Sequence, residues 1–90
     1  SMLNTYLQTL VTDRPLFVRS RNRYLKIKYA TFVKMAPPTI LIFSNLVKEI
    51  PDHYRRYLTN SLRRHFGLKG APIHLVFRNQ HSKDKSLEAI

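Results

Sequence analysis

The residues whose types and spacing are best suited to binding a ligand are four arginines in a stretch of the sequence that carries no acid. They are Arg55, Arg56, Arg63 and Arg64. Arg56 and Arg63 are seven positions apart, so on a helix they share one stripe, and the other two flank it. Exposed helices usually interleave acids for pairing one turn away, and none occurs between Asp52 and Phe66. Because guanidinium groups bind phosphate oxygens in pairs, this stretch favours a polyanion, against the alternative of a solvated helix face.

Three lysines form a second group of candidate phosphate ligands: Lys26, Lys28 and Lys69. Lys26 and Lys28 share one face of a predicted strand with Tyr24 and Phe32, a pattern that could stack bases and hold phosphates. The alternative is a sheet face whose aromatic side chains pack on a neighbouring domain. Lys69 lies in Gly67-Leu68-Lys69-Gly70, which has the spacing of the loop that clamps nucleic-acid backbone in KH domains. Its position after a helix favours a helix cap and a turn instead.

Patterns for catalysis or metal binding are not found in the sequence. The two glycines, Gly67 and Gly70, do not form a G-x-x-x-x-G-K-[ST] phosphate loop, so we expect no nucleotide hydrolysis by this chain alone. The acids suit cap and surface positions rather than a catalytic pair. His53 and His65 lie twelve positions apart on one predicted helix, about 18 Å by helical rise, and cannot share an ion. We therefore expect no catalytic residue, metal or cofactor within the chain.

Composition and charge indicate the same kind of partner. The 90 residues make one domain, with 16 Lys and Arg against 5 Asp and Glu and a formal net charge of +11. Such a chain attracts polyanions through its long-range field and through counterion release. Nucleic acid is favoured over an anionic membrane or no polyanion. No apolar run is long enough to span a bilayer, and the absence of cysteine fits a reducing, cytoplasmic location.

Hydrophobic periodicity predicts two helices and three strands that would position these side chains. The helices are expected over residues 3–11 and 51–66, and the strands over residues 24–33, 39–45 and 73–78. Residues 1–78 then form the domain, and residues 79–90 are expected to be a polar, disordered tail. The order α-β-β-α-β predicts an α+β fold, with the helices packed on one face of a three-stranded sheet.

The second predicted strand is apolar on both faces, because Ile40 and Ile42 alternate with Leu41 and Phe43. Such a strand is normally covered on both sides. In a domain of this size, one of the covering layers is expected to come from outside the chain. The helix that follows leads into the third strand, and this makes the second and third strands parallel if they share a sheet.

Three blocks of the sequence together resemble one family. The first is Leu25-Lys26-Ile27-x-Tyr29-Ala30-Thr31, followed by Pro37-Pro38-Thr39 and by Asn45 at the end of the apolar strand. The second is Pro51-x-x-Tyr54-Arg55-Arg56-Tyr57-Leu58, and the third is Gly67-x-x-Gly70-x-Pro72-Ile73-x-Leu75-x-Phe77-Arg78. In this order and spacing, residues 3–78 are similar to the C-terminal KH-like domain of the bacterial ribosome-assembly GTPase Der, also called EngA.

The resemblance implies two roles. Such proteins carry two GTPase domains ahead of this module and act in late maturation of the large (50S) ribosomal subunit. Ribosomal RNA (rRNA) is then the implied polyanion, bound by the four arginines and three lysines, while GTP and Mg²⁺ would belong to domains outside this chain. In the second role the module docks on the GTPase domains and couples their nucleotide state to shape, through the apolar residues Leu41, Phe43 and Phe32. The opening Ser1-Met2 is expected of a fragment of such a longer protein.

Overall fold

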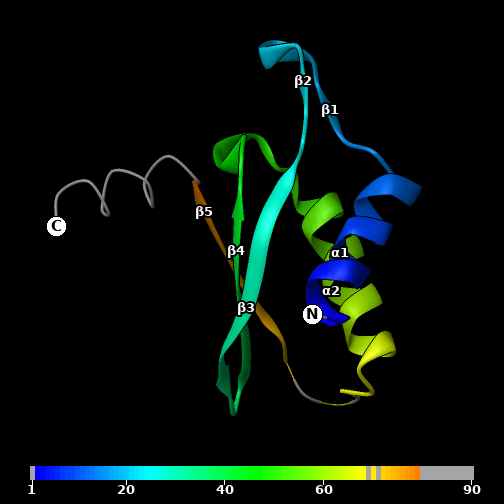
Figure 1. Ribbon diagram of the computed structural model, residues 1–90, viewed down its shortest axis with the longest axis vertical. Coiled ribbons are helices and arrows are strands. Elements are labelled where there is room, and N and C mark those ends of the chain that lie inside the picture. Colours follow the sequence, from blue (N-terminus) through cyan, green and yellow to red (C-terminus); the bar gives the residue numbers. More distant parts are fainter. Residues whose placement is uncertain (1, 69, 71, 80–90) are drawn as a thin grey trace, which may run out of the picture.

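Two helices lie against one face of a three-stranded sheet, and a short two-stranded ribbon extends beyond them (Figure 1). The computed structural model describes residues 2–68, 70 and 72–79. Its elements in chain order are α1 (Met2–Asp13), β1 (Phe17–Val18), the 3-10 turn η1 (Arg19–Arg21), β2 (Arg23–Tyr24), β3 (Ile27–Met35), β4 (Pro38–Ser44), the 3-10 turn η2 (Val47–Glu49), α2 (Asp52–His65) and β5 (His74–Asn79). The predicted α+β class and the order of its five main elements are confirmed.

The sheet has β4 at its centre, between β3 and β5. β3 and β4 are antiparallel neighbours, whereas β4 and β5 are parallel, as expected for two strands joined through a helix. Along β4 the side chains alternate between buried and half-buried. Ile40 and Ile42 are on the buried side and have no solvent exposure. The central position of β4 explains why its sequence is apolar on both faces.

The core lies between the sheet and the helices. Leu7 of α1, Leu58 and Leu62 of α2, and the two isoleucines of β4 are fully buried in one cluster. Full burial of an aliphatic side chain of this size contributes about 1.5–3 kcal/mol. These contacts hold both helices on the same face of the sheet, as Figure 1 shows.

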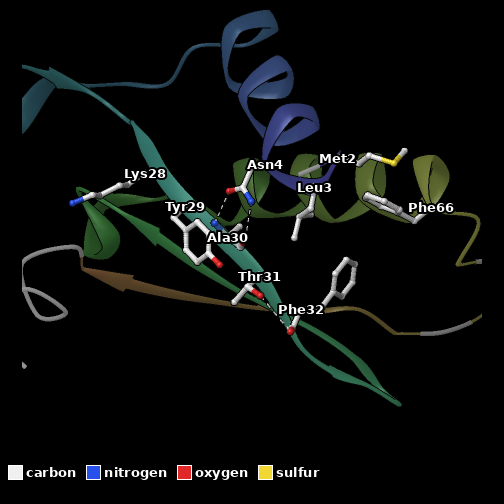
Figure 2. Close-up of a pocket in the computed structure, with 9 residues that line it drawn as sticks. All are labelled: Met2, Leu3, Asn4, Lys28, Tyr29, Ala30, Thr31, Phe32 and Phe66. Atoms are coloured by element: carbon white, nitrogen blue, oxygen red, sulfur yellow. Dashed lines mark hydrogen bonds between the residues drawn. The ribbon is translucent and has the colours of Figure 1, made fainter. Parts of the chain in front are cut away.

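Polar side chains of α1 bind the outer edge of β3. Asn4 Nδ2 donates to the Ala30 carbonyl at 2.9 Å, and Asn4 Oδ1 accepts from the Ala30 amide at 2.7 Å (Figure 2). Gln8 Nε2 donates to the Ile27 carbonyl at 2.6 Å. An edge strand presents backbone groups that have no strand partner on that side, so these bonds satisfy the edge and fix α1 beside it.

β3 begins at Ile27, and its side chains do not follow the single alternation that the sequence predicted. Its register against β4 shifts between Ile27 and Tyr29, and again between Phe32 and Lys34. An irregularity of the bulge type places an additional residue in one strand and reverses the faces that follow. Ile27 and Ala30 are therefore both buried, whereas Tyr29 is 44% exposed. A single alternation along the predicted strand would put Ile27 and Tyr29 on one face, and this prediction is wrong.

α2 ends at a glycine, as predicted. Gly67 has a φ of +65°, and the Leu68 amide donates to the Arg63 carbonyl at 3.0 Å. This is the bond by which a left-handed residue closes a helix, and Leu68 packs back against the core. The cap interpretation of this stretch is confirmed at Gly67, whereas Lys69 lies outside the described residues.

Residues 16–22, for which the hydrophobic periodicity predicts no helix or strand, contribute to an antiparallel ribbon. β1 and β2 pair through Phe17 with Tyr24 and through Val18 with Arg23, and η1 forms the turn between them. Asn22 closes the turn with a φ of 52°, a left-handed conformation that asparagine adopts more readily than most residues. Strands of two residues are too short for alternation to be recognised, so the sequence pattern could not predict them.

Candidate nucleic-acid interface

Basic side chains meet at a shallow depression that we call the arginine groove. It lies where the end of α1 adjoins α2, and its lining consists of Arg14, His53, Arg56, Tyr57, Asn60, Ser61 and Arg64. Among the described residues, this lining contains three arginines and no acid. The groove therefore gathers positive charge, which suits phosphate oxygens.

Two tyrosines of α2, Tyr54 and the groove residue Tyr57, cap the end of α1. Tyr57 Oη donates to the Leu10 carbonyl at 2.7 Å, and Tyr54 Oη donates to the Arg14 carbonyl at 2.6 Å. The last carbonyls of a helix have no partner within it, so the phenols complete the C-terminal end of α1. Through these bonds α2 fixes the place at which the chain leaves α1.

Burial keeps both phenols neutral. It raises the pKa of Tyr54 from 10.0 to about 12, with a smaller contribution from the neighbouring Tyr57. Burial is also the main cause that raises the pKa of Tyr57, and the negative charge of Asp13 adds to it, while Arg14 opposes it. The two hydroxyls therefore remain hydrogen-bond donors throughout the neutral pH range.

Arg14 is a groove residue that the sequence analysis did not include among its candidate ligands. Its guanidinium carbon lies 5.0 Å from the centre of the Tyr57 ring, a cation–π contact at the negative end of α1. The contact positions the positive charge at the rim of the groove. From the sequence, a cation just after a predicted helix can be expected to interact favourably with the helix dipole. The sequence does not show that Arg14 lies near Arg56, which is 42 positions away.

The four predicted arginines do not form one surface. Arg56 and Arg64 line the groove, and half-buried Arg63 is beside it, because its Nη1 donates to Asn60 Oδ1 at 3.2 Å. Arg55 lies elsewhere: its guanidinium carbon is 4.7 Å from the centre of the Phe77 ring of β5, and its Nη2 donates to the Val47 carbonyl at 3.5 Å. Successive helix residues point about 100° apart, which directs Arg55 toward the sheet.

The predicted lysines are also separated. Lys26 lines a second basic depression at the base of the ribbon. Lys28 lies at the β3 irregularity, on the rim of a shallow pocket between α1 and the β3 edge (Figure 2). Lys69 lies outside the described part of the chain. The predicted common face of Lys26, Lys28, Tyr24 and Phe32 does not exist, because β3 starts after Tyr24 and then changes register.

The three predicted docking residues lie on opposite faces of the sheet. Leu41 and Phe43 are half-buried on the outer face, where Leu41 pairs with Val76. Phe32 instead packs against the core, with its ring 5.9 Å from that of Phe66 in an edge-to-face contact (Figure 2). The register shift in β3 turns the Phe32 side chain toward the core, so Phe32 does not belong to the outer face.

The described residues carry no group of three histidine, cysteine, aspartate or glutamate side chains that could hold a metal ion. His53 lines the groove, whereas the His65 ring stacks on Tyr6 at 3.8 Å. In the same part of the chain, neither helix is long and apolar enough to cross a membrane. The three arginines of the groove suit it to the binding of anions.

Two helices on one face of a three-stranded mixed sheet, with a basic groove where the helices meet, place the protein in the class of KH-like domains. The family model described as "KH-domain-like of EngA bacterial GTPase enzymes, C-terminal" matches residues 1–78. The chain belongs to this family.

Individual proteins named GTPase Der are also similar to this chain. GTPase Der of Cereibacter sphaeroides is 42% identical over 82 residues, which cover 91% of this chain and 17% of that protein. GTPase Der of Desulforudis audaxviator is 42% identical over 83 residues, covering 92% and 19%, respectively. GTPase Der of Gemmatimonas aurantiaca is 41% identical over 64 residues, covering 71% and 15%. The chain thus spans less than one-fifth of the length of these curated relatives.

Proposed function

We propose that this domain is the RNA-binding module of a Der-type GTPase that acts in assembly of the large ribosomal subunit, and that it binds rRNA backbone in the arginine groove. The observation that supports this most strongly is the meeting of Arg14, Arg56 and Arg64 in a lining without acids. GTP hydrolysis, with its GTP and Mg²⁺, is assigned to domains outside this chain, which covers 17% of the relative from Cereibacter sphaeroides.

The groove fits RNA backbone better than a single small anion. Its cations come from α2 and from Arg14 just after α1, so they are spread along a surface that successive phosphates can follow. Exposed Asn60 lies between Arg56 and Arg64 along α2 and provides a neutral hydrogen-bonding group. The net charge of +11 adds a long-range attraction that does not depend on sequence.

Binding to fragments of large-subunit rRNA, measured by fluorescence anisotropy over a salt series, tests this function. The variant Arg56→Ala/Arg64→Ala is expected to weaken binding and to reduce the log–log salt slope by about 1.5, since each phosphate contact contributes roughly 0.7–0.9. Lys34→Ala/Lys48→Ala is the matched control, because it removes two exposed charges outside the groove. Equal affinities and slopes for the two double variants would exclude the groove as the RNA site.

A second function, docking on the GTPase domains of the same protein, is favoured by the outer face of the sheet. Tyr29 and Val76 are 44% and 37% exposed there, and half-buried Leu41 lies between their strands. We propose that this face packs on the GTPase domains and couples their nucleotide state to the position of the arginine groove.

Mixing the chain with a Der protein that lacks this domain tests the docking function. We expect binding and a change in GTP turnover, and both should be lost in Leu41→Glu. The groove variant Arg56→Ala/Arg64→Ala is the control, because it leaves the sheet face intact. If neither wild type nor Leu41→Glu binds or alters turnover, the docking function is wrong and the RNA function is unaffected.

A further inference from the structure

The ribbon carries a second concentration of positive charge, separate from the arginine groove. Arg19, Arg21 and Arg23 are all exposed on it, and exposed Lys26 follows where the chain enters β3. Arg21 is paired, since its Nη1 lies 3.7 Å from Glu49 Oε1. Within the described residues, no ion pair is recorded for Arg23 or Lys26. These two cations are therefore available to an anion from outside.

Two aromatic side chains stand beside these cations. Phe17 and Tyr24 are directly opposite each other in the ribbon, and they are 41% and 53% exposed. Their ring centres are 4.9 Å apart in an edge-to-face contact. Directly opposite residues of an antiparallel pair point to the same face, so Phe17 packs against the Tyr24 ring and supports it. Solvent-exposed aromatic rings of this kind are the platforms on which single-stranded nucleic acids stack their bases.

Tyr24 and the cations share one depression, which we call the ribbon pocket. Its lining consists of Arg21, Arg23, Tyr24, Lys26, Asn45, Leu46 and Asn79. A stacking platform and two cations that form no ion pair within the described part of the chain therefore open onto one pocket, and none of its described lining residues is an acid. A lipid headgroup or a small anion would use the charges but would not need the ring.

Asn45 makes the base of the ribbon rigid. Its Oδ1 accepts from the Lys26 amide at 2.7 Å, and its Nδ2 donates to the Tyr24 carbonyl at 3.1 Å. The Asn45 amide donates to the Lys26 carbonyl at 3.3 Å, and the Leu25 amide donates to the Leu16 carbonyl at 2.8 Å. The backbone that bears Tyr24 and Lys26 is thus fixed before any ligand arrives, which lowers the entropy cost of binding.

We propose that the ribbon pocket binds one unpaired nucleotide of RNA, with its base stacked on Tyr24 and its flanking phosphates held by Arg23 and Lys26. This inference rests on the proposed function, because RNA is the partner that the groove brings to the molecule. An unpaired nucleotide is required because the face of a base is accessible to a side chain only when the base has left the helical stack. The ribbon therefore distinguishes single-stranded from duplex RNA, which the groove does not.

Two RNA hairpins test the inference, one blunt and one with a single-stranded overhang that carries 2-aminopurine as a fluorescent base. The wild-type chain is expected to bind the overhang RNA more tightly and to change its 2-aminopurine fluorescence. Tyr24→Ala should weaken binding of the overhang RNA by on the order of tenfold and leave the blunt hairpin unchanged. Tyr24→Phe retains the ring and should bind as wild type does. Tyr29→Ala, which removes another exposed tyrosine, is the control.

The variants separate failure of the ribbon from failure of the groove. If Tyr24→Ala binds the overhang RNA as tightly as wild type, or if wild type does not prefer the overhang, the ribbon inference is overturned and the groove assignment stands. If Arg56→Ala/Arg64→Ala binds the blunt hairpin at full strength, the groove assignment fails, whatever the ribbon does. Arg23→Ala/Lys26→Ala is a second probe that retains the tyrosine, and it should reduce the salt slope for the overhang RNA only.

Discussion

At the scale of single residues, tyrosine hydroxyl groups of α2 form hydrogen bonds to the end of α1. Tyr54 is buried, and its hydroxyl donates to the Arg14 carbonyl at the point where the chain leaves α1. The same segment then carries the Arg14 guanidinium to the rim of the groove. This one hydrogen bond therefore contributes both to the stability of the helix pair and to the placement of Arg14 at the groove.

Tyr54→Phe is expected to lower the free energy of unfolding by about 1 kcal/mol, because it leaves the Arg14 carbonyl without the phenol while preserving the ring. Urea denaturation measures the loss. Tyr24→Phe is the matched control, because Tyr24 is 53% exposed and its hydroxyl can bond to water in either state. A loss of equal size in both variants would contradict the role of the Tyr54 hydroxyl.

The raised pKa of Tyr54 predicts how this contribution depends on pH. The pKa is about 12 in the folded protein and 10.0 in the reference state, so folding favours the neutral phenol. The stabilisation is fully present below pH 10.0 and is lost as the pH rises toward about 12. Unfolding of wild type and Tyr54→Phe should therefore show a difference that is constant at neutral pH and shrinks above pH 10.0. A difference that stays the same through this window would show that the phenol does not titrate with folding.

At the scale of elements, an acidic residue at the end of α1 and one at the start of α2 are expected to affect stability in opposite directions. Asp13 is the last residue of α1, where a negative charge opposes the helix dipole, and Asp52 is the first residue of α2, where it complements the dipole. Asp13→Asn is expected to raise the free energy of unfolding and Asp52→Asn to lower it, each by about 0.3–1 kcal/mol at low salt. Each variant removes one negative charge, so opposite signs in urea denaturation cannot come from the net charge. Changes of the same sign would refute the dipole explanation.

The hydrogen bonds between α1 and the edge of β3 lead to a second prediction at the scale of elements. Ala30 is 2% exposed, and Asn4 binds both its amide and its carbonyl. Asn4→Ala leaves these buried groups without that partner and should cost about 1–3 kcal/mol. Hydrogen exchange of the Ala30 amide should become faster than in Thr5→Ala, a substitution at an exposed position of the same helix. Unchanged protection of this amide would mean that the β3 edge does not depend on α1.

The sequence could predict the elements because their apolar faces are periodic over many residues. The helices and the three long strands therefore appear close to their predicted bounds, and Gly67 ends α2 as expected. The shift between Ile27 and Tyr29 was not predictable, because an additional residue in one strand is defined only against its partner. The sequence could place Arg56 and Arg64 on one helix, whereas Arg14 joins them only through packing of α1 on α2.

At the scale of the whole molecule, short chain segments connect the ribbon pocket to the end of the arginine groove that Arg14 and His53 line. β4 ends at Ser44, and the next two residues line the ribbon pocket. η2 follows and leads into the start of α2, where His53 lines the groove. Three residues after Arg14 the chain enters the ribbon. The outer sheet face, by contrast, carries the exposed side chains of Tyr29 and Val76. RNA and a protein partner could therefore be bound on different surfaces of one small domain.

This arrangement predicts that one RNA can occupy the arginine groove and the ribbon pocket together. Once the duplex is in the groove, binding of the attached single strand becomes intramolecular, and its effective concentration reaches the millimolar range for a short flexible linkage. A hairpin with a covalent overhang should therefore bind on the order of tenfold tighter than the better of its two separated pieces, which is the gain expected from one stacked base. Tyr24→Ala should abolish that gain without changing the affinity for the hairpin piece alone. If the linked RNA binds no better than its separate parts, the two surfaces cannot be filled by one molecule, and each would have to serve a different RNA.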